Sequence, residues 1–239
     1  GYGEYLNVSL PESAMVSNMA GLFGPPVAET VIAGVLSFYR GISLLDSLKE
    51  HKRWIGGGLR RELQTIDGAK VMLLGYGDLG KQLERRLLSF GAYLQIFRMN
   101  PVHGQHHLLI DLDKFLSSAD IIISCLPDSP ETRGLFSKGR IAKMKKAAIF
   151  VNVGRGTVLD ENALAEALRN ESISGGVIDV TMEEPLPNDS VLWTCPNLIL
   201  TQHTGGGHKL ELLKKIDFLV QNYKRYIDGT SLVNDITWS

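Results

Sequence analysis

The sequence of 239 residues lacks several features that mark particular classes of protein. It contains no run of about 18 or more uncharged apolar residues, so no transmembrane helix is predicted. Its first residues, GYGEYLNVSL, have neither a basic start nor an apolar core, and no export signal is predicted. The only cysteines are Cys125 and Cys195, which excludes a disulfide scaffold and favours the reducing cytoplasm.

An excess of charge of either sign is also absent. The chain has 25 Lys and Arg against 26 Asp and Glu, a formal net charge of −1. No global electrostatic attraction to nucleic acid or to an acidic membrane follows, and neither partner is predicted. Hydrophobic residues at 44% and charged residues at 21% are ordinary for a globular protein, and the length allows one large domain or two small ones.

From residue 70 onward, short apolar segments alternate with amphipathic ones. The apolar segments are KVMLLG (70–75), AYLQIF (92–97), IIISCL (121–126), AIFVNV (148–153), GGVIDV (175–180) and NLILT (197–201). The helical patterns between them span residues 79–90, 112–119, 137–144 and 161–170. Each apolar segment has few charges, as a strand covered on both faces requires. The alternation predicts an α/β fold with a Rossmann-type, doubly wound parallel sheet.

The residues before this region predict helices. Pro25 and Pro26 precede an apolar helix over residues 27–42, which fits the preference of proline for a first helical turn. Because this helix is apolar over most of its circumference, we expect it to be buried and to form the contact of a homodimer. A charged helix over residues 44–54 and a glycine linker over residues 56–58 follow. Residues 209–228 predict a further amphipathic helix.

The segment GYGDLG (75–80) is a GxGxxG motif that directly follows a predicted strand and begins a predicted helix. In this context Gly75 permits a tight turn, Gly77 lets the backbone approach a pyrophosphate, and Gly80 lets the helix pack closely on the strand. The free amides of the first helical turn then face the anion. The motif predicts a dinucleotide cofactor, bound by Gly75, Gly77, Asp78, Leu79 and Gly80.

The end of the second strand indicates which cofactor. NAD-binding domains place Asp or Glu there, about 20 residues after the motif, to bind the ribose 2′-hydroxyl. Here Arg98 stands 18 residues after Gly80, and no acidic residue occurs between Glu84 and Asp111. A guanidinium binds a 2′-phosphate with a fork of donors, so NADP is predicted with NAD as second choice. A solvated arginine at a strand end is the alternative.

Five segments together resemble the D-isomer-specific 2-hydroxyacid dehydrogenases, which include glyoxylate/hydroxypyruvate reductases. They are FGPPVAETVIAGVLSFYRG (23–41), LPDSPETRGLF (126–136), NVGRGTVLDENALAEAL (152–168), GGVIDVTMEEPLP (175–187) and NLILTQHTGGG (197–207). The resemblance covers nearly the whole chain. It implies the catalytic residues Arg155, Glu184 and His203, and it implies that Asp179 contacts the nicotinamide carboxamide.

The chemistry of the family suits these residue types. A fixed guanidinium such as Arg155 binds the carboxylate of a 2-oxo acid and polarises its ketone. An imidazole such as His203 donates a proton near neutral pH, and Glu184 beside it favours the protonated ring. Each of the three also has a structural alternative: a loop cation, a solvated acidic turn and a core histidine. Asp179 has a turn aspartate as its alternative.

The resemblance also implies which parts of the family's fold the chain contains. We expect a dinucleotide-binding domain over residues 18–207, with residues 1–17 and 208–239 as a remnant of a flavodoxin-like substrate domain. Most of that N-terminal domain is then absent. Tyr2 and Gly3 resemble its late glycine loop, whose amides touch the substrate carboxylate. The family pattern around the histidine differs here, and the glycines at 205–207 are expected to loosen its loop.

The predicted function is hydride transfer between NADP(H) and a small 2-oxo or 2-hydroxy acid of the glyoxylate or hydroxypyruvate type. Two alternatives stay open: an NAD(P)-sensing interaction protein like the related corepressors, and an NAD-linked D-2-hydroxyacid dehydrogenase.

Histidines cluster in PVHGQHH (101–107), but with no cysteine or carboxylate nearby the segment predicts a surface loop beside the adenosine phosphate, and no metal site.

Overall fold

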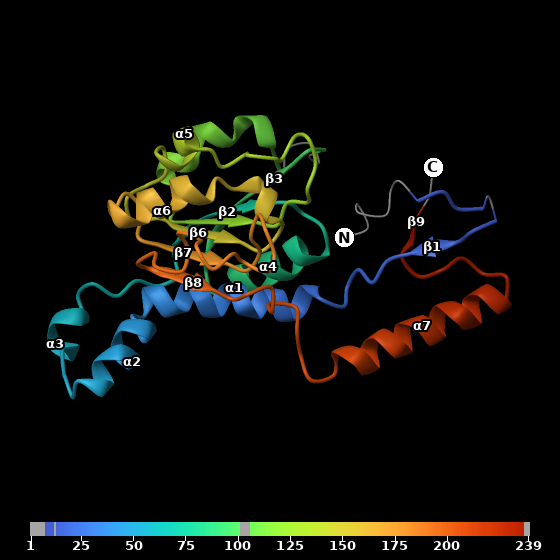
Figure 1. Cartoon of the computed structure of the whole chain (residues 1–239), viewed down its shortest axis with the longest axis horizontal. Helices are drawn as coiled ribbons and strands as arrows, with labels where there is room; N and C mark the ends of the chain where they lie inside the picture. The colour runs from blue at the N-terminus through green and yellow to red at the C-terminus, as the bar shows by residue number, and fades with distance from the viewer. Residues whose placement is uncertain (1–7, 12, 101–105, 237–239) are drawn as a thin grey trace.

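The computed structural model describes residues 8–11, 13–100 and 106–236 (Figure 1). Its centre is a seven-stranded sheet in which every neighbouring pair of strands is parallel. The strands are β2 (Lys70–Leu74), β3 (Tyr93–Arg98), β4 (His107–Leu108), β5 (Ile121–Ser124), β6 (Ile149–Asn152), β7 (Gly175–Ile178) and β8 (Leu198–Leu200). Their order is β4-β3-β2-β5-β6-β7-β8. The prediction of a Rossmann-type parallel sheet is confirmed, and all six predicted strands are present.

Both faces of the sheet are covered, as the apolar strands require. Val71 and Leu73 of β2 point into one core cluster while Met72 and Leu74 point into the other, and all four side chains are fully buried. Helices α1 (Gly24–Tyr39) and α4 (Asp78–Ser89) cover the first face. The second face is covered by α5 (Lys138–Ile141), α6 (Glu161–Arg169) and the 3₁₀ turns η2 (Leu109–Lys114) and η3 (Leu116–Ser118).

Helix α1 lies beneath the sheet, as Figure 1 shows, and its apolar residues pack within its own domain. Val31 and Val35 are fully buried there, which confirms the predicted burial. The helix begins at Gly24, so that Pro25 and Pro26 occupy its first turn. A Cβ at Gly34 would lie 2.8 Å from the Val177 side chain, so glycine permits this close approach of helix to strand.

Some local predictions differ from the structure. The glycines at 56–58, predicted as a linker, form the one-turn helix α3 (Gly56–Leu59) after α2 (Ile42–Glu50). The predicted helix over residues 112–119 is two 3₁₀ turns, where side chains such as Leu112 and Leu116 are buried without a full α-helix. A further 3₁₀ turn, η4 (Gly156–Val158), follows β6.

A second, smaller unit lies apart from the sheet at the right of Figure 1. It contains α7 (Glu211–Ile227) and an antiparallel pair of short strands, β1 (Val16–Ser17) and β9 (Asp235–Ile236). Asn222, which is buried on α7, joins them: its amide nitrogen donates to Ser17 Oγ (2.9 Å) and its amide oxygen accepts from Val233 N (2.8 Å). We propose on this basis the predicted division into residues 18–207 and a second unit of residues 1–17 and 208–239.

Candidate active site

The GxGxxG motif forms a tight turn between β2 and α4. Gly75 has φ +95°, and a Cβ there would lie 2.9 Å from the carbonyl oxygen of Cys125. A Cβ at Gly80 would lie 2.4 Å from the carbonyl oxygen of Gly75, so any side chain would push α4 away from the turn. Gly77, at the N-terminus of α4, has nothing within 4 Å of such a Cβ. The turn is therefore closed on the protein side and open where a phosphate would approach.

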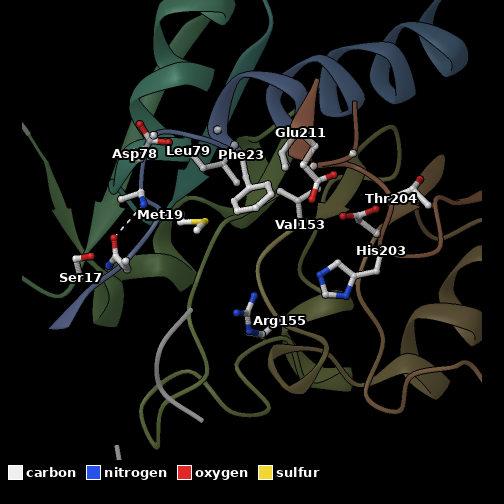
Figure 2. Close-up of a pocket in the computed structure, with 18 of the residues that line it drawn as sticks. Ser17, Met19, Phe23, Asp78, Leu79, Val153, Arg155, His203, Thr204 and Glu211 are labelled. Atoms are coloured by element: carbon white, nitrogen blue, oxygen red, sulfur yellow. Dashed lines mark hydrogen bonds between the residues drawn. The ribbon is translucent and has the colours of Figure 1, made fainter. Parts of the chain in front are cut away.

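This turn lies where the winding of the sheet reverses. From β2 the sheet extends through β3 and β4 in one direction, and from β5 it extends through β6, β7 and β8 in the other. Open α/β sheets bind their ligands at such a switch point. A cleft of about 1180 Å³ lies here, between the sheet body and residues 8, 10 and 16–21. Figure 2 shows Arg155 and His203 in it, with Asp78 and Leu79 at a different end.

Arg98 ends β3 and belongs to a small cluster beside the motif. Its guanidinium carbon lies 5.8 Å from the ring centroid of Tyr76, and the ring of His106 lies 4.8 Å from the same tyrosine ring. The hydroxyl of Tyr76 donates to Glu84 Oε2 (2.5 Å), and this hydrogen bond together with burial raises the pKa of Tyr76. The cluster thus offers a cation and two aromatic rings, tilted by 49° to each other, to a nucleotide. Sequence reasoning missed Tyr76, although its position inside the motif was a signal.

Arg155 lies in the turn after β6 and lines the cleft. The buried side chain of Asn152 holds the turn, because its amide nitrogen donates to Arg155 O (3.0 Å) and its oxygen accepts from Gly154 N (3.3 Å). A Cβ at Gly154 would lie 2.4 Å from a backbone oxygen after β5, and one at Gly156 would lie 1.9 Å from the carbonyl carbon of Thr181. Close packing on both sides therefore explains the two glycines that flank the arginine.

Glu184 and His203 form a hydrogen-bonded pair, and His203 lines the cleft. Nδ1 of His203 lies 2.6 Å from Glu184 Oε2, while Glu184 Oε1 accepts from Thr181 N (3.0 Å). The carboxylate thus connects its own turn to Nδ1 of the imidazole, and Nε2 is the ring nitrogen that Glu184 does not contact. A smaller pocket of about 430 Å³, lined in part by Pro185 and Trp193, lies beside the pair.

Asp179 is buried, with 4% of its surface exposed, and it holds the loop that carries His203. Its Oδ1 accepts from Thr201 Oγ1 (2.5 Å) and Gly205 N (3.0 Å), and its backbone oxygen accepts from His203 N (2.6 Å). A Cβ at Gly205 would lie 2.8 Å from Asp179 Oδ2, so this glycine allows tight packing of the loop that it was expected to loosen. Asp179 therefore has the role of a turn aspartate and also lines the cleft.

The structure brings half of the predicted site residues together. Asp78, Leu79, Arg155, Asp179 and His203 line one cleft, and Glu184 joins them through His203. Arg98 lies at the end of β3, outside this lining. Tyr2 and Gly3 lie outside the described residues. Sequence reasoning missed Thr181 and Thr201, whose bonds to Glu184 and Asp179 were signalled only by their places just after strand ends.

A guanidinium and a carboxylate-bound imidazole around one cleft can bind and polarise a carbonyl group and protonate its oxygen. The sequence and fold comparisons agree with that chemistry. Residues 32–205 match the model of the D-isomer specific 2-hydroxyacid dehydrogenase family, NAD binding domain. The chain belongs to this family. Among curated relatives, glyoxylate/hydroxypyruvate reductase B of Klebsiella pneumoniae is 36% identical over 75% of this chain and 57% of its own length.

Solved structures of family members have the same fold. One from Aeromonas salmonicida is 32% identical with a TM-score of 0.85, and the match covers 100% of this chain and 76% of that one. One from Xanthobacter autotrophicus, in complex with NADPH and MES, is 29% identical with a TM-score of 0.82 and covers 99% and 98% of the two chains. The chain spans 52% to 58% of the length of several curated relatives.

Proposed function

We propose that the protein reduces a small 2-oxo acid, of the glyoxylate or hydroxypyruvate type, with NADPH. The observation that carries this proposal is the contact of 2.6 Å between Glu184 Oε2 and Nδ1 of His203, with His203 on the cleft that Arg155 also lines. The similarity to a glyoxylate/hydroxypyruvate reductase over 75% of the chain supports the substrate class. The parallel sheet and the GxGxxG turn at its switch point support a dinucleotide as the second reactant.

In this proposal the side chains bind and protonate the substrate. Arg155 binds the carboxylate and polarises the ketone oxygen. A bound nicotinamide cofactor supplies the hydride that the carbonyl carbon accepts. Nε2 of His203 gives its proton to the oxygen of that carbonyl, which completes the 2-hydroxy acid. Glu184 contacts Nδ1 and thereby fixes the orientation of the imidazole ring.

The preference for NADPH over NADH is proposed from the residues at the end of β3. Arg98 stands where an acidic residue would bind the 2′-hydroxyl of NAD, and it lies 5.8 Å from the ring of Tyr76. The relative of known structure from Xanthobacter autotrophicus was solved with NADPH, which supports the same choice. Gly75, Gly77 and Gly80 would hold the pyrophosphate. Asp179 lies buried at the cleft, where a contact with the carboxamide stays a prediction.

We also propose that the protein is a homodimer. Three exposed apolar side chains support a contact at the end of the predicted helix 27–42 and on α2: Ile42, Leu44 and Leu45, with 53%, 46% and 43% of their surfaces exposed.

Among the described residues, no single helix is long and apolar enough to cross a membrane, and α1 and α2 reach that length only together across a 63° bend. The cytoplasm and the absence of nucleic acid partners stay predictions.

The proposal is tested by following nicotinamide absorbance with NADPH or NADH and either glyoxylate or hydroxypyruvate, using the full-length protein. We expect loss of absorbance, faster with NADPH, and a loss of turnover in Arg155→Ala. Turnover of every 2-oxo acid tested that is unchanged in Arg155→Ala would contradict the assigned role. Tight NADPH binding without any turnover would favour the sensing interaction protein instead.

A further inference from the structure

The turn that carries Glu184 has an unusual arrangement of carboxylates. Its first two backbone N–H groups each donate to a glutamate: Thr181 N to Glu184 Oε1 (3.0 Å) and Met182 N to Glu161 Oε1 (2.7 Å). Hydrogen bonds to ionised acceptors are stronger than neutral ones. Glu184 belongs to the turn itself, whereas Glu161 comes from a different element. Glu161 is therefore the external anchor of this turn.

Glu161 is suited to an anchoring role by its place on α6. It is the first residue of that helix, which is fixed to the core through buried side chains such as Leu164 and Leu168. The helix does not need Glu161 as a cap, because the side chain of Asp160 already accepts from Ala163 N (2.9 Å). A carboxylate in a first helical turn is also favoured by the helix dipole. Glu161 is half-buried, and burial raises its pKa while the Met182 N–H opposes that shift.

The anchored turn also touches the loop of Arg155. A Cβ at Gly156 would lie 1.9 Å from the carbonyl carbon of Thr181 and 2.4 Å from Met182 N. The backbone beside Arg155 therefore packs against the same peptide that Glu161 holds through Met182. A displacement of this peptide would change the position of Glu184 and the packing beside Arg155 together.

We propose that Glu161 is a positioning residue that holds the 181–184 turn, so that the Glu184 carboxylate meets Nδ1 of His203. Glu161 does not line the cleft and acts only through Met182. The proposal rests on the function proposed for the Glu184–His203 pair. Loss of the anchor leaves Glu184 less often in place, so that proton donation by His203 becomes less frequent while the cofactor end of the cleft is unaffected.

The test compares three variants of the full-length protein: Glu161→Ala, Glu161→Gln and Glu166→Ala. The amide of Glu161→Gln keeps an oxygen that can accept from Met182 N. Glu166→Ala is the matched control, since Glu166 is exposed on the same helix and pairs with Lys138 (2.6 Å) away from the turn. The measurements are kcat with NADPH and a 2-oxo acid, the Kd of NADPH, the pH profile of kcat, and the NMR signal of the imidazole of His203.

We expect kcat to fall about tenfold in Glu161→Ala, a part of what general acid catalysis contributes, with the Kd of NADPH unchanged. The pH profile of kcat should change, and the NMR signal of the His203 imidazole should shift because its carboxylate partner is less often in place. Glu161→Gln should recover most of the activity and Glu166→Ala should behave as wild type. If Glu161→Ala does not fold, Glu161→Asp, one methylene shorter, takes its place.

An unchanged His203 signal and unchanged kcat in Glu161→Ala would overturn the proposal. So would equal losses in Glu161→Ala and Glu161→Gln, or equal losses in Glu161→Ala and Glu166→Ala. The NMR signal needs no turnover, so it tests the anchor even if the wild-type protein reduces no 2-oxo acid. The absence of wild-type turnover would contradict the proposed function alone.

Discussion

The two ends of the cleft are built in different ways. At the nucleotide end, backbone geometry decides the shape: a Cβ at Gly75 or Gly80 would lie 2.9 Å or 2.4 Å from a neighbouring carbonyl oxygen, where no side chain would fit. At the catalytic end, side chains decide: Glu184, His203 and Asp179 are held by hydrogen bonds between loops. We therefore expect substitutions at the nucleotide end to change cofactor binding or stability, and substitutions at the catalytic end to change the chemical step.

The largest expected effect is at the catalytic end. In His203→Ala the proton donor is lost, and kcat should fall by about 10² to 10⁴. The Kd of NADPH should stay close to wild type, because the motif lies at a different end of the cleft. Steady-state kinetics and fluorescence titration measure the two quantities. His51→Ala, an exposed histidine after α2, is the control. A loss of NADPH affinity as large as the loss of kcat would contradict the separate roles of the two ends of the cleft.

A smaller effect is expected for the cofactor preference. Arg98→Asp removes a charge-assisted bond to the 2′-phosphate and adds a repulsive charge, so NADPH should bind about 10- to 100-fold more weakly. NADH, which has no such phosphate, should lose little affinity. Arg85→Asp, an exposed position on α4, serves as the control in the same titrations. Equal losses for both cofactors would identify Arg98 as a stacking residue only.

Two glycines of the GxGxxG turn are expected to affect different properties: Gly80 the stability of the fold, and Gly77 the binding of NADPH. In Gly80→Ala the new Cβ meets Gly75 O at 2.4 Å, and the free energy of unfolding should fall by about 1–3 kcal/mol. Gly77→Ala has open space around its Cβ and should cost less than about 1 kcal/mol, yet weaken the binding of NADPH because the backbone approaches the phosphate there. Urea unfolding and titration separate these effects. Equal destabilisation of the two variants would contradict the packing argument.

The smallest effect is expected at the N-terminal ends of the neighbouring strands β2 and β5, at the other end of these strands from the cleft. Burial would raise the pKa of Asp120, but Lys145 Nζ (2.5 Å) and Lys70 N (2.8 Å) lower it below its ordinary value of 3.8. A carboxylate with a lowered pKa stabilises the fold above pH 3.8, and this contribution is lost as the pH falls through the folded-state pKa.

Asp120→Asn should therefore reduce the free energy of unfolding by about 1 kcal/mol at neutral pH, and the difference from wild type should vanish in acid. Urea unfolding across this pH range measures it. Activity should be unchanged at neutral pH. A destabilisation that persists undiminished at the lowest pH would contradict the charge-based explanation.

The body of the fold was predictable because its strands are almost purely apolar. Residues of β5, such as Ile121 and Ile123, are apolar on both faces of the strand, whereas a strand with one face in solvent would alternate apolar and polar residues. The beginning of α4 was predictable from the GxGxxG motif. The two residues of β4 could not be predicted, since His107 and Leu108 have no pattern and pair only because β3 lies beside them. Helix α3 was missed because three glycines favour a linker when tertiary contacts are unknown.

The site was predictable where motifs sit at strand ends, and not where its parts meet across long separations. Arg155 and His203 follow β6 and β8 directly, so the sheet brings them to one edge. The bond from Met182 N to Glu161 joins residues that are far apart in sequence and carry no shared pattern. The tilted contact between the rings of His106 and Tyr76 could not be predicted for the same reason, since the sequence alone does not show how the chain between them is placed.

Isotope transfer from cofactor to product tests most directly whether this cleft catalyses the reduction of a 2-oxo acid. NADPH deuterated at the transferring position of the nicotinamide is mixed with the full-length protein and hydroxypyruvate or glyoxylate, and the product is analysed by mass spectrometry. We expect deuterium on the hydroxyl-bearing carbon of the product, and almost no deuterated product with His203→Ala. NADPH that binds tightly but leaves no deuterium in any 2-hydroxy acid would contradict the proposed reduction.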